Sequence, residues 1–166
     1  MSEPVSAADL ATVAAQLGRP PRGTRAVAHR CPCGLPDVVE TTPRLGDGSP
    51  FPTLFYLTCP TAVAACSRLE SAGRMREMTA RLAEDPELAA RYRTAHADYL
   101  ARRRAVAEVP EIAGVSAGGM PGRVKCLHAL LAHALAAGPG VNPFGDEVRE
   151  QVTPWWSGGR CVPGPT

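Results

Sequence analysis

Seven cysteine and histidine residues have side chains and spacing suited to metal binding. Cys31 and Cys33 are two residues apart, and in an extended segment residues at that spacing point to the same side. Pro32 favours an extended conformation at Cys31, and Gly34 permits a tight bend that brings backbone N–H groups toward a bound sulfur. Cys-Pro-Cys-Gly therefore looks like a zinc knuckle shortened by one residue. The full set of candidate ligands is His29, Cys31, Cys33, Cys59, Cys126, His128 and His133.

Two further cysteines complete a set of four thiolates. Cys59 follows a predicted strand and directly precedes Pro60, where a strand end can present a third thiolate. Cys126, in the early part of a predicted helix, is the fourth. Structural zinc prefers tetrahedral coordination of this kind, and an iron–sulfur cluster also favours four thiolates. We predict a zinc site at Cys31, Cys33, Cys59 and Cys126, with an iron–sulfur cluster as the alternative.

The two histidines that follow Cys126 are alternative ligands, and helical geometry separates them. His133 is seven residues after Cys126 and lies on nearly the same helical face, whereas His128 is two residues on and points almost oppositely. If the segment is regular helix, His133 is the better ligand. If Cys126 precedes the regular helix, the Cys-Leu-His unit can curl around the ion and His128 becomes the candidate.

Four of the cysteines and histidines, including His29 from the set above, are expected to have no metal role. Cys66 lies between Val63 and Leu69 on an apolar helical face, which indicates core packing. Cys161 lies in an aperiodic tail with no sign of an ordered site. His29 and His96 have no close partner in the sequence and are expected to be structural or exposed.

A glycine-rich stretch before a predicted helix is a candidate anion site. Exposed N–H groups at a helix start, reinforced by the helix dipole, bind phosphate or carboxylate groups, and basic residues in the opening turns can clamp them. A structural loop that only lets two elements approach closely is the competing interpretation. The residues of this possible anion site are Ser116, Gly118, Gly119, Arg123 and Lys125.

Common catalytic signatures are missing from the sequence. It has no Gly-x-Ser-x-Gly and no His-Glu-x-x-His, so the hydrolases and metalloproteases that carry them are not indicated. A metal-assisted enzyme that acts on a phosphorylated small molecule at the glycine loop stays open as a further alternative.

The apolar pattern predicts an α+β fold that is mostly helical, with a small antiparallel β-hairpin region near residues 25–59. Ser6 and Asp9 resemble a capping box, and Asp85-Pro86 resembles an N-cap followed by a first-turn proline. We expect a single globular domain over residues 1–153 and an irregular tail over 154–166. The predicted helices cover about 6–17, 60–72, 86–106, 121–137 and 143–148, with a further short helix that carries Met75, Met78 and Leu82.

Composition narrows the classes of protein. A chain of 166 residues with a formal charge of +2 can build one real core, and its charge gives no reason to expect a nucleic-acid partner. The longest apolar stretch is interrupted by His128 and His133, so no membrane span is expected. Acidic Glu3 and Asp9 near the N-terminus argue against a secretory signal, and we expect a cytoplasmic protein with reduced thiols.

Five motifs stand out in the sequence: His29-Arg-Cys-Pro-Cys-Gly34, Pro50 to Pro60, Ser116-Ala-Gly-Gly-Met-Pro121, Arg123-Val-Lys-Cys-Leu-His128 and Gly138 to Pro143. Together, over about residues 8–156, they resemble those of the actinobacterial domain-of-unknown-function family 501. The resemblance implies a bacterial cytosolic protein, often encoded beside a septum-formation initiator and an exopolyphosphatase-like enzyme. That setting suggests a partner in cell division or envelope growth and a phosphate-bearing small ligand.

The leading hypothesis is therefore a metal-stabilised binding or regulatory domain. In it the four cysteines tie the hairpin to the helix that is expected to begin near Pro121, and loss of the metal loosens or unfolds the domain.

Overall fold

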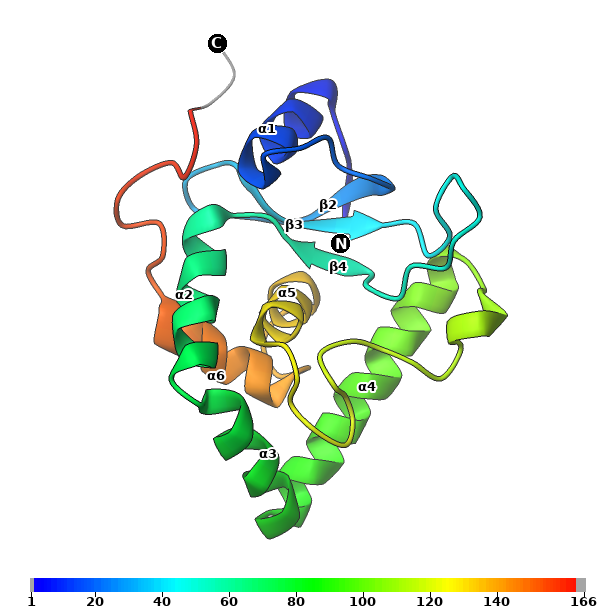
Figure 1. The fold of residues 1–166 in the computed structure, drawn as a ribbon, viewed down its shortest axis with the longest axis vertical. Helices are drawn as coiled ribbons and strands as arrows, with labels where there is room; N and C mark the ends of the chain where they lie inside the picture. Colours follow the sequence, from blue (N-terminus) through cyan, green and yellow to red (C-terminus); the bar gives the residue numbers. More distant parts are fainter. Residues whose placement is uncertain (1, 164–166) are drawn as a thin grey trace.

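The computed structural model describes residues 2–163 and confirms an α+β fold, with one antiparallel sheet and helices that pack against it (Figure 1). The first helix, α1 (Ala7–Leu17), begins as its sequence predicts. The Ser6 hydroxyl accepts a hydrogen bond from the Asp9 N–H, and the Asp9 carboxylate accepts one from the Ser6 N–H. Gly18 ends the helix with φ +72°, a conformation that glycine adopts without steric cost.

The sheet has four antiparallel strands in the order β1-β2-β3-β4. They are β1 (Glu3–Pro4), β2 (Thr24–Arg30), β3 (Pro36–Thr41) and β4 (Phe55–Leu57). The predicted hairpin region is confirmed, and the structure adds the short strand β1 at its outer edge. The Cys31–Gly34 segment is the turn that joins β2 to β3.

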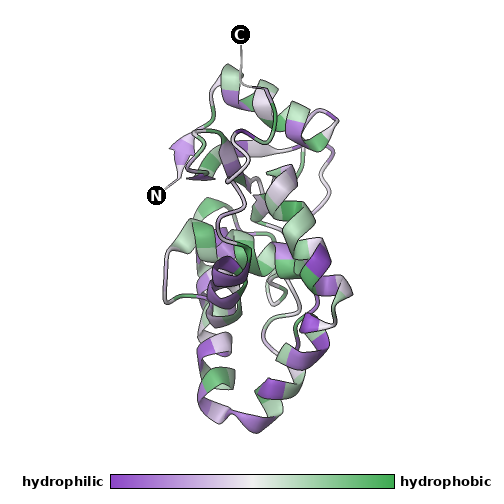
Figure 2. Ribbon diagram, turned by 90° about the vertical axis from the view of Figure 1, so that its left-hand side faces the viewer, coloured by the Kyte–Doolittle hydropathy of each residue, from purple (hydrophilic) through white to green (hydrophobic). Residues whose placement is uncertain are grey.

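Three consecutive helices follow the sheet: α2 (Pro60–Ser71), α3 (Arg74–Glu84) and α4 (Pro86–Val106). The Asp85 carboxylate accepts a hydrogen bond from the Leu88 N–H, which confirms the predicted N-cap. A short 3-10 turn, η1 (Pro110–Ile112), comes after α4. Helices α3 and α4 meet far from the sheet, and the C-terminal half of α4 returns to it (Figure 1). The ribbons of the two helices mix hydrophilic and hydrophobic residues (Figure 2).

The next helix, α5 (Leu127–Ala137), begins six residues later than the predicted start at Pro121. The glycine loop folds back on itself first, because the Gly118 carbonyl accepts hydrogen bonds from the N–H groups of Lys125 and Cys126. Cys126 is extended, with φ −150°, and forms the N-cap of α5. The last helix, α6 (Pro143–Val152), begins after the Asn142 cap.

Helix α5 is the centre of the core (Figure 1). Its residues Leu127, Leu130 and Leu131 are fully buried, and one continuous apolar cluster runs from the sheet through α5 to α6. The segment after α6 has no helix or strand up to residue 163, but Trp155 is buried in that same cluster. None of the helices described is long and apolar enough to cross a membrane.

Candidate metal centre

The four cysteines of the predicted zinc site do not come together. Cys31 and Cys33 lie in the β2–β3 turn and Cys59 caps the N-terminus of α2, whereas Cys126 lies beside Glu70 in the last turn of α2. Glu70 is eleven residues after Cys59, a length of about 16 Å along a helix. Cys59 and Glu70 are therefore at opposite ends of α2. Cys126, which lies beside Glu70, consequently has neighbours other than Cys59.

Those neighbours are Glu70 and His128. Glu70 Oε2 lies 3.0 Å from His128 Nδ1, and Cys126 Sγ lies 3.9 Å from the same nitrogen. The carboxylate, thiol and imidazole atoms all lie within 4.8 Å of one another, and in the described residues no other three potential metal ligands of these types do so. Three donor atoms of different types therefore lie close enough together to be candidate ligands of one ion.

The opposite side of the His128 ring fixes its orientation. Nε2 lies 3.2 Å from the carbonyl oxygen of Val63, and a carbonyl oxygen can only accept, so Nε2 carries a proton and donates it. Nε2 also lies 3.2 Å from the Ser67 hydroxyl. A ring held this way presents Nδ1 to the thiol and the carboxylate, which is the arrangement usual for a histidine that binds a metal.

The backbone at the start of α5 holds the Glu70 carboxylate. Glu70 Oε2 accepts a hydrogen bond of 2.8 Å from the Leu127 N–H, so the carboxylate caps the positive end of α5. The side chains of Glu70 and His128 keep 23% and 25% of their surface exposed, which leaves the site open to solvent.

Cys126 and His128 shift each other's pKa. Burial opposes ionisation of the Cys126 thiol, but contacts with His128 and with the Ala129 backbone N–H outweigh burial and lower the pKa of Cys126. The thiol of Cys126 in turn, helped by Glu70 and against the effect of burial, raises the pKa of His128 to about 9. The site thus favours the thiolate, the form of cysteine that binds metals.

The other predicted ligands of this region lie elsewhere. His133, the second alternate ligand, is fully buried between Asp98, at 2.8 Å from Nε2, and Asn142, at 3.1 Å from Nδ1. Cys66 is buried in the core, as predicted, and burial raises the pKa of its thiol to about 12. His96 lies 2.7 Å from the Ser116 hydroxyl, in a structural pair that joins α4 to the glycine loop.

The structure gives the glycine loop a packing role. Gly118 and Gly119 have φ +66° and φ +92°, and a side chain on either would collide with Leu130 or with the Arg123 carbonyl. The N–H groups of Arg123, Lys125 and Cys126 donate to carbonyls within the loop, and the Leu127 N–H donates to Glu70. Ser116 is buried against His96, whereas the side chains of Arg123 and Lys125 are exposed.

The sequence did not predict Glu70 as a ligand, and it predicted His128 only for the case in which Cys126 precedes the regular helix. Glu70 lies 56 residues before Cys126, and nothing in its helical pattern sets it apart from a solvated carboxylate. The Cys-Leu-His spacing was informative, since it predicts a curled ligand pair whenever Cys126 precedes the helix.

Comparison with known proteins adds a family but no activity. A family described as "Protein of unknown function (DUF501)" matches residues 27–150. No curated protein and no solved structure matches the chain.

Proposed function

The chain belongs to the DUF501 family, and we propose that it is a metal-binding domain that holds zinc at Glu70, Cys126 and His128. The observation that carries the proposal is that the ligand atoms of His128, Cys126 and Glu70 all lie within 4.8 Å of one another. This site replaces the four-cysteine set expected from the sequence.

The donor types fit zinc. Thiolate sulfur, imidazole nitrogen and carboxylate oxygen are its usual protein ligands, at about 2.0–2.3 Å from the ion. Tetrahedral ligands at such distances lie about 3.3–3.8 Å from one another. The observed 3.9 Å between sulfur and nitrogen and 3.0 Å between nitrogen and oxygen need only small side-chain shifts.

Three protein ligands and partial exposure favour a site with an open position over a closed structural one. Zinc sites that exchange ligands or assist reactions keep the fourth position for water or substrate. A single thiolate does not suit an iron–sulfur cluster, which is usually held by four. At this place in the fold, zinc is therefore the better candidate.

A metal-assisted enzyme that acts on a phosphorylated small molecule is the second candidate function. It is favoured by Lys125, an exposed cation that directly precedes Cys126, and by exposed Arg123 in the same loop. Replacing Arg123 and Lys125 together by Gln is expected to abolish binding of inorganic phosphate to the zinc-loaded protein. Unchanged phosphate binding would remove this candidate.

We also propose a cytoplasmic location and a regulatory role with a partner in cell division or envelope growth. The six cysteines are all free thiols, which fits a reducing compartment. Cell fractionation tests the location, because recovery of the native chain outside the cytoplasm would contradict it. Co-purification of other proteins with the native chain from dividing cells tests whether it has such a partner.

Zinc and cobalt binding test the main proposal. Cys126→Ser, His128→Gln and Glu70→Gln are each expected to weaken zinc binding at this site at least 10-fold, because each removes a ligand atom. Glu87→Gln, which changes an exposed carboxylate near the start of α4, is the control and is expected to bind like the wild type. Zinc content and affinity equal to wild type in all three variants would overturn the proposal.

A further inference from the structure

Four other cysteines gather at the opposite end of α2. Cys31 and Cys33 come from the β2–β3 turn, Cys59 from the N-cap of α2, and Cys161 from the segment that follows α6. Cys31 and Cys59 are buried in the core cluster, and Cys33 and Cys161 pack against it. We call these residues the four-thiol cluster.

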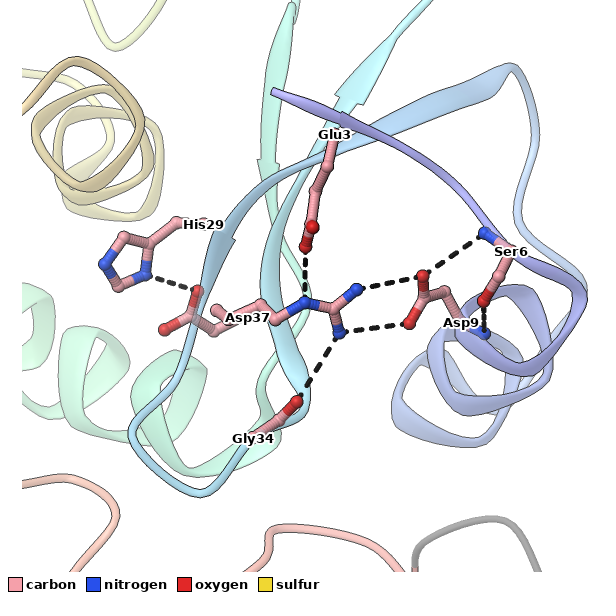
Figure 3. Close-up of polar contacts among 7 residues, drawn as sticks. Glu3, Ser6, Asp9, His29, Gly34 and Asp37 are labelled. Atoms are coloured by element: carbon pink, nitrogen blue, oxygen red, sulfur yellow. Dashed lines mark hydrogen bonds and ion pairs between the residues drawn. The ribbon is translucent and has the colours of Figure 1, made fainter. Parts of the chain in front are cut away.

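The turn that carries Cys31 and Cys33 is held by its neighbours. Arg30 binds Glu3 and Asp9 through its guanidinium and donates a hydrogen bond of 3.4 Å to the Gly34 carbonyl (Figure 3). Within the turn, the Cys33 N–H lies 3.5 Å from Cys31 Sγ. A backbone N–H directed at a thiol sulfur is the feature expected of a zinc knuckle.

The tail returns to this turn. Figure 1 shows the chain after α6 running back past α2 toward the loop between β2 and β3. Gln16 links the two, because its Nε2 donates to the Pro36 carbonyl at 2.7 Å and lies 3.4 Å from Cys161 Sγ. Burial, together with the nearby thiols of Cys59 and Cys33, raises the pKa of Cys161 to about 11, although Gln16 acts in the opposite sense.

Unpaired polar atoms border the same place. The described residues contain four buried side-chain atoms without a hydrogen-bond partner, and three of them are Gln16 Oε1, Asp37 Oδ2 and Thr58 Oγ1. Gln16 contacts Cys161, and Thr58 directly precedes Cys59. Asp37 is fully buried, joined on one oxygen to His29 at 2.7 Å and open on the other (Figure 3). Buried polar groups are nearly always satisfied, so a polar or ionic group bound at this place would find hydrogen-bond partners among these atoms.

We propose that Cys31, Cys33, Cys59 and Cys161 bind a zinc ion through four thiolates and so fasten the C-terminal segment to the sheet. The proposal is independent of the site at Glu70, Cys126 and His128. As described, no three of the four sulfurs lie within 4.8 Å of one another, so binding of the ion requires side-chain movement. Cys33 and Cys161 are partly exposed and belong to a turn and to the tail, and these two side chains can rotate toward the buried pair.

The proposed site differs from the four-cysteine set expected from the sequence in one ligand. Cys161 takes the place of Cys126, although Cys161 was expected to have no metal role. Each thiol gives up its proton to solvent when zinc binds, and the ion offsets the charge of the buried thiolates.

The test uses the full chain, purified without oxygen and in the presence of reductant, then loaded with Zn²⁺ or Co²⁺. Cys161→Ser and Cys33→Ser are expected to lose one zinc per chain and most of the cobalt–thiolate absorption. Cys126→Ser is expected to keep that absorption, since only one of its cobalt–sulfur bonds is lost. If the site at Glu70, Cys126 and His128 alone fails, Cys126→Ser keeps the zinc content of the wild type while Cys161→Ser still loses one zinc. If the four-thiol site alone fails, Cys126→Ser loses zinc and Cys161→Ser does not, so the two proposals fail separately.

Alkylation followed by mass spectrometry keeps the proposal testable if a serine variant does not fold. In the zinc-loaded wild type, the four thiols are expected to resist alkylation until a chelator is added, and then to react together. Equal zinc content in Cys161→Ser and wild type would overturn the proposal. So would a Cys59–Cys161 disulfide that persists in reductant, or a brown protein with iron in place of zinc.

Discussion

Asp9 and Arg30 form a bidentate ion pair that joins α1 to β2. The two Nη atoms of Arg30 donate to the two carboxylate oxygens of Asp9 at 3.1 and 3.0 Å, and Nε of the same guanidinium contacts Glu3 in β1 (Figure 3). Paired, parallel hydrogen bonds of this kind are stronger and more directional than a single contact. One arginine therefore connects a strand, a helix and the turn that carries Cys31.

Arg30→Met is expected to destabilise the protein by about 0.5–1.5 kcal/mol at neutral pH, a modest figure because the Arg30 side chain is 37% exposed. Arg30 lowers the pKa of Asp9, so the stabilisation is present above the ordinary carboxyl pKa and is lost as pH falls through the folded value. Urea unfolding should therefore show a gap between wild type and variant that narrows in acid. Arg22→Met removes the exposed Arg22–Asp47 pair and is expected to change little; an equal loss there would contradict the assignment.

Gly119→Ala is expected to cost about 2 kcal/mol or more. Gly119 has φ +92°, and an added Cβ would lie 2.7 Å from the Arg123 carbonyl oxygen. Thermal unfolding measures the loss. Gly122→Ala is the control, because its Cβ meets nothing within 4 Å and the position needs no left-handed backbone. If Gly119→Ala were as stable as Gly122→Ala, the result would contradict the tightly folded conformation of the glycine loop.

Tyr99→Phe is expected to destabilise the fold by about 2 kcal/mol, because it removes only the hydroxyl group and keeps the aromatic ring. The buried Tyr99 hydroxyl accepts hydrogen bonds from the N–H groups of Leu54, at 2.7 Å, and Phe55, at 3.2 Å. The phenylalanine leaves two buried donors unpaired where α4 meets the start of β4. Hydrogen exchange should show faster exchange at these two amides, and unchanged exchange would contradict the contact. Tyr56→Phe, at a partly exposed position on the same strand, is the control.

The parts of the fold that depend on neighbouring residues could be predicted from the sequence. The caps at Ser6 and Asp85 need a side chain and an N–H three residues away, and both are present as predicted. The start of α5 could not be predicted, because it depends on hydrogen bonds by which the glycine loop closes on its own carbonyls.

The candidate sites show the same division. Cys31 and Cys33 could be paired from their spacing, but the partners of Cys126 are set by the packing of α2 against α5. Glu70 in a helix and Cys161 in a tail have no local pattern that marks them as ligands. Their roles depend on which distant segments the core brings together, and this is information that one sequence does not carry.

Removal of metal is expected to lower the melting temperature of the wild type. An ion present at 100 times its dissociation constant stabilises the folded state by about 2.7 kcal/mol, which corresponds to about 5–10 °C for a domain of this size. Calorimetry of zinc-loaded protein with and without a chelator measures the shift.

The double variant Cys126→Ser with Cys161→Ser separates the effect of the ion from a general effect of the chelator. Because one ligand of each proposed site is gone, the chelator is expected to move its melting temperature by less than a third of the wild-type shift. The single variants should retain intermediate shifts, since each keeps one intact site. A double variant that still responds like the wild type would show that the ion binds elsewhere, and both proposed sites would then be wrong.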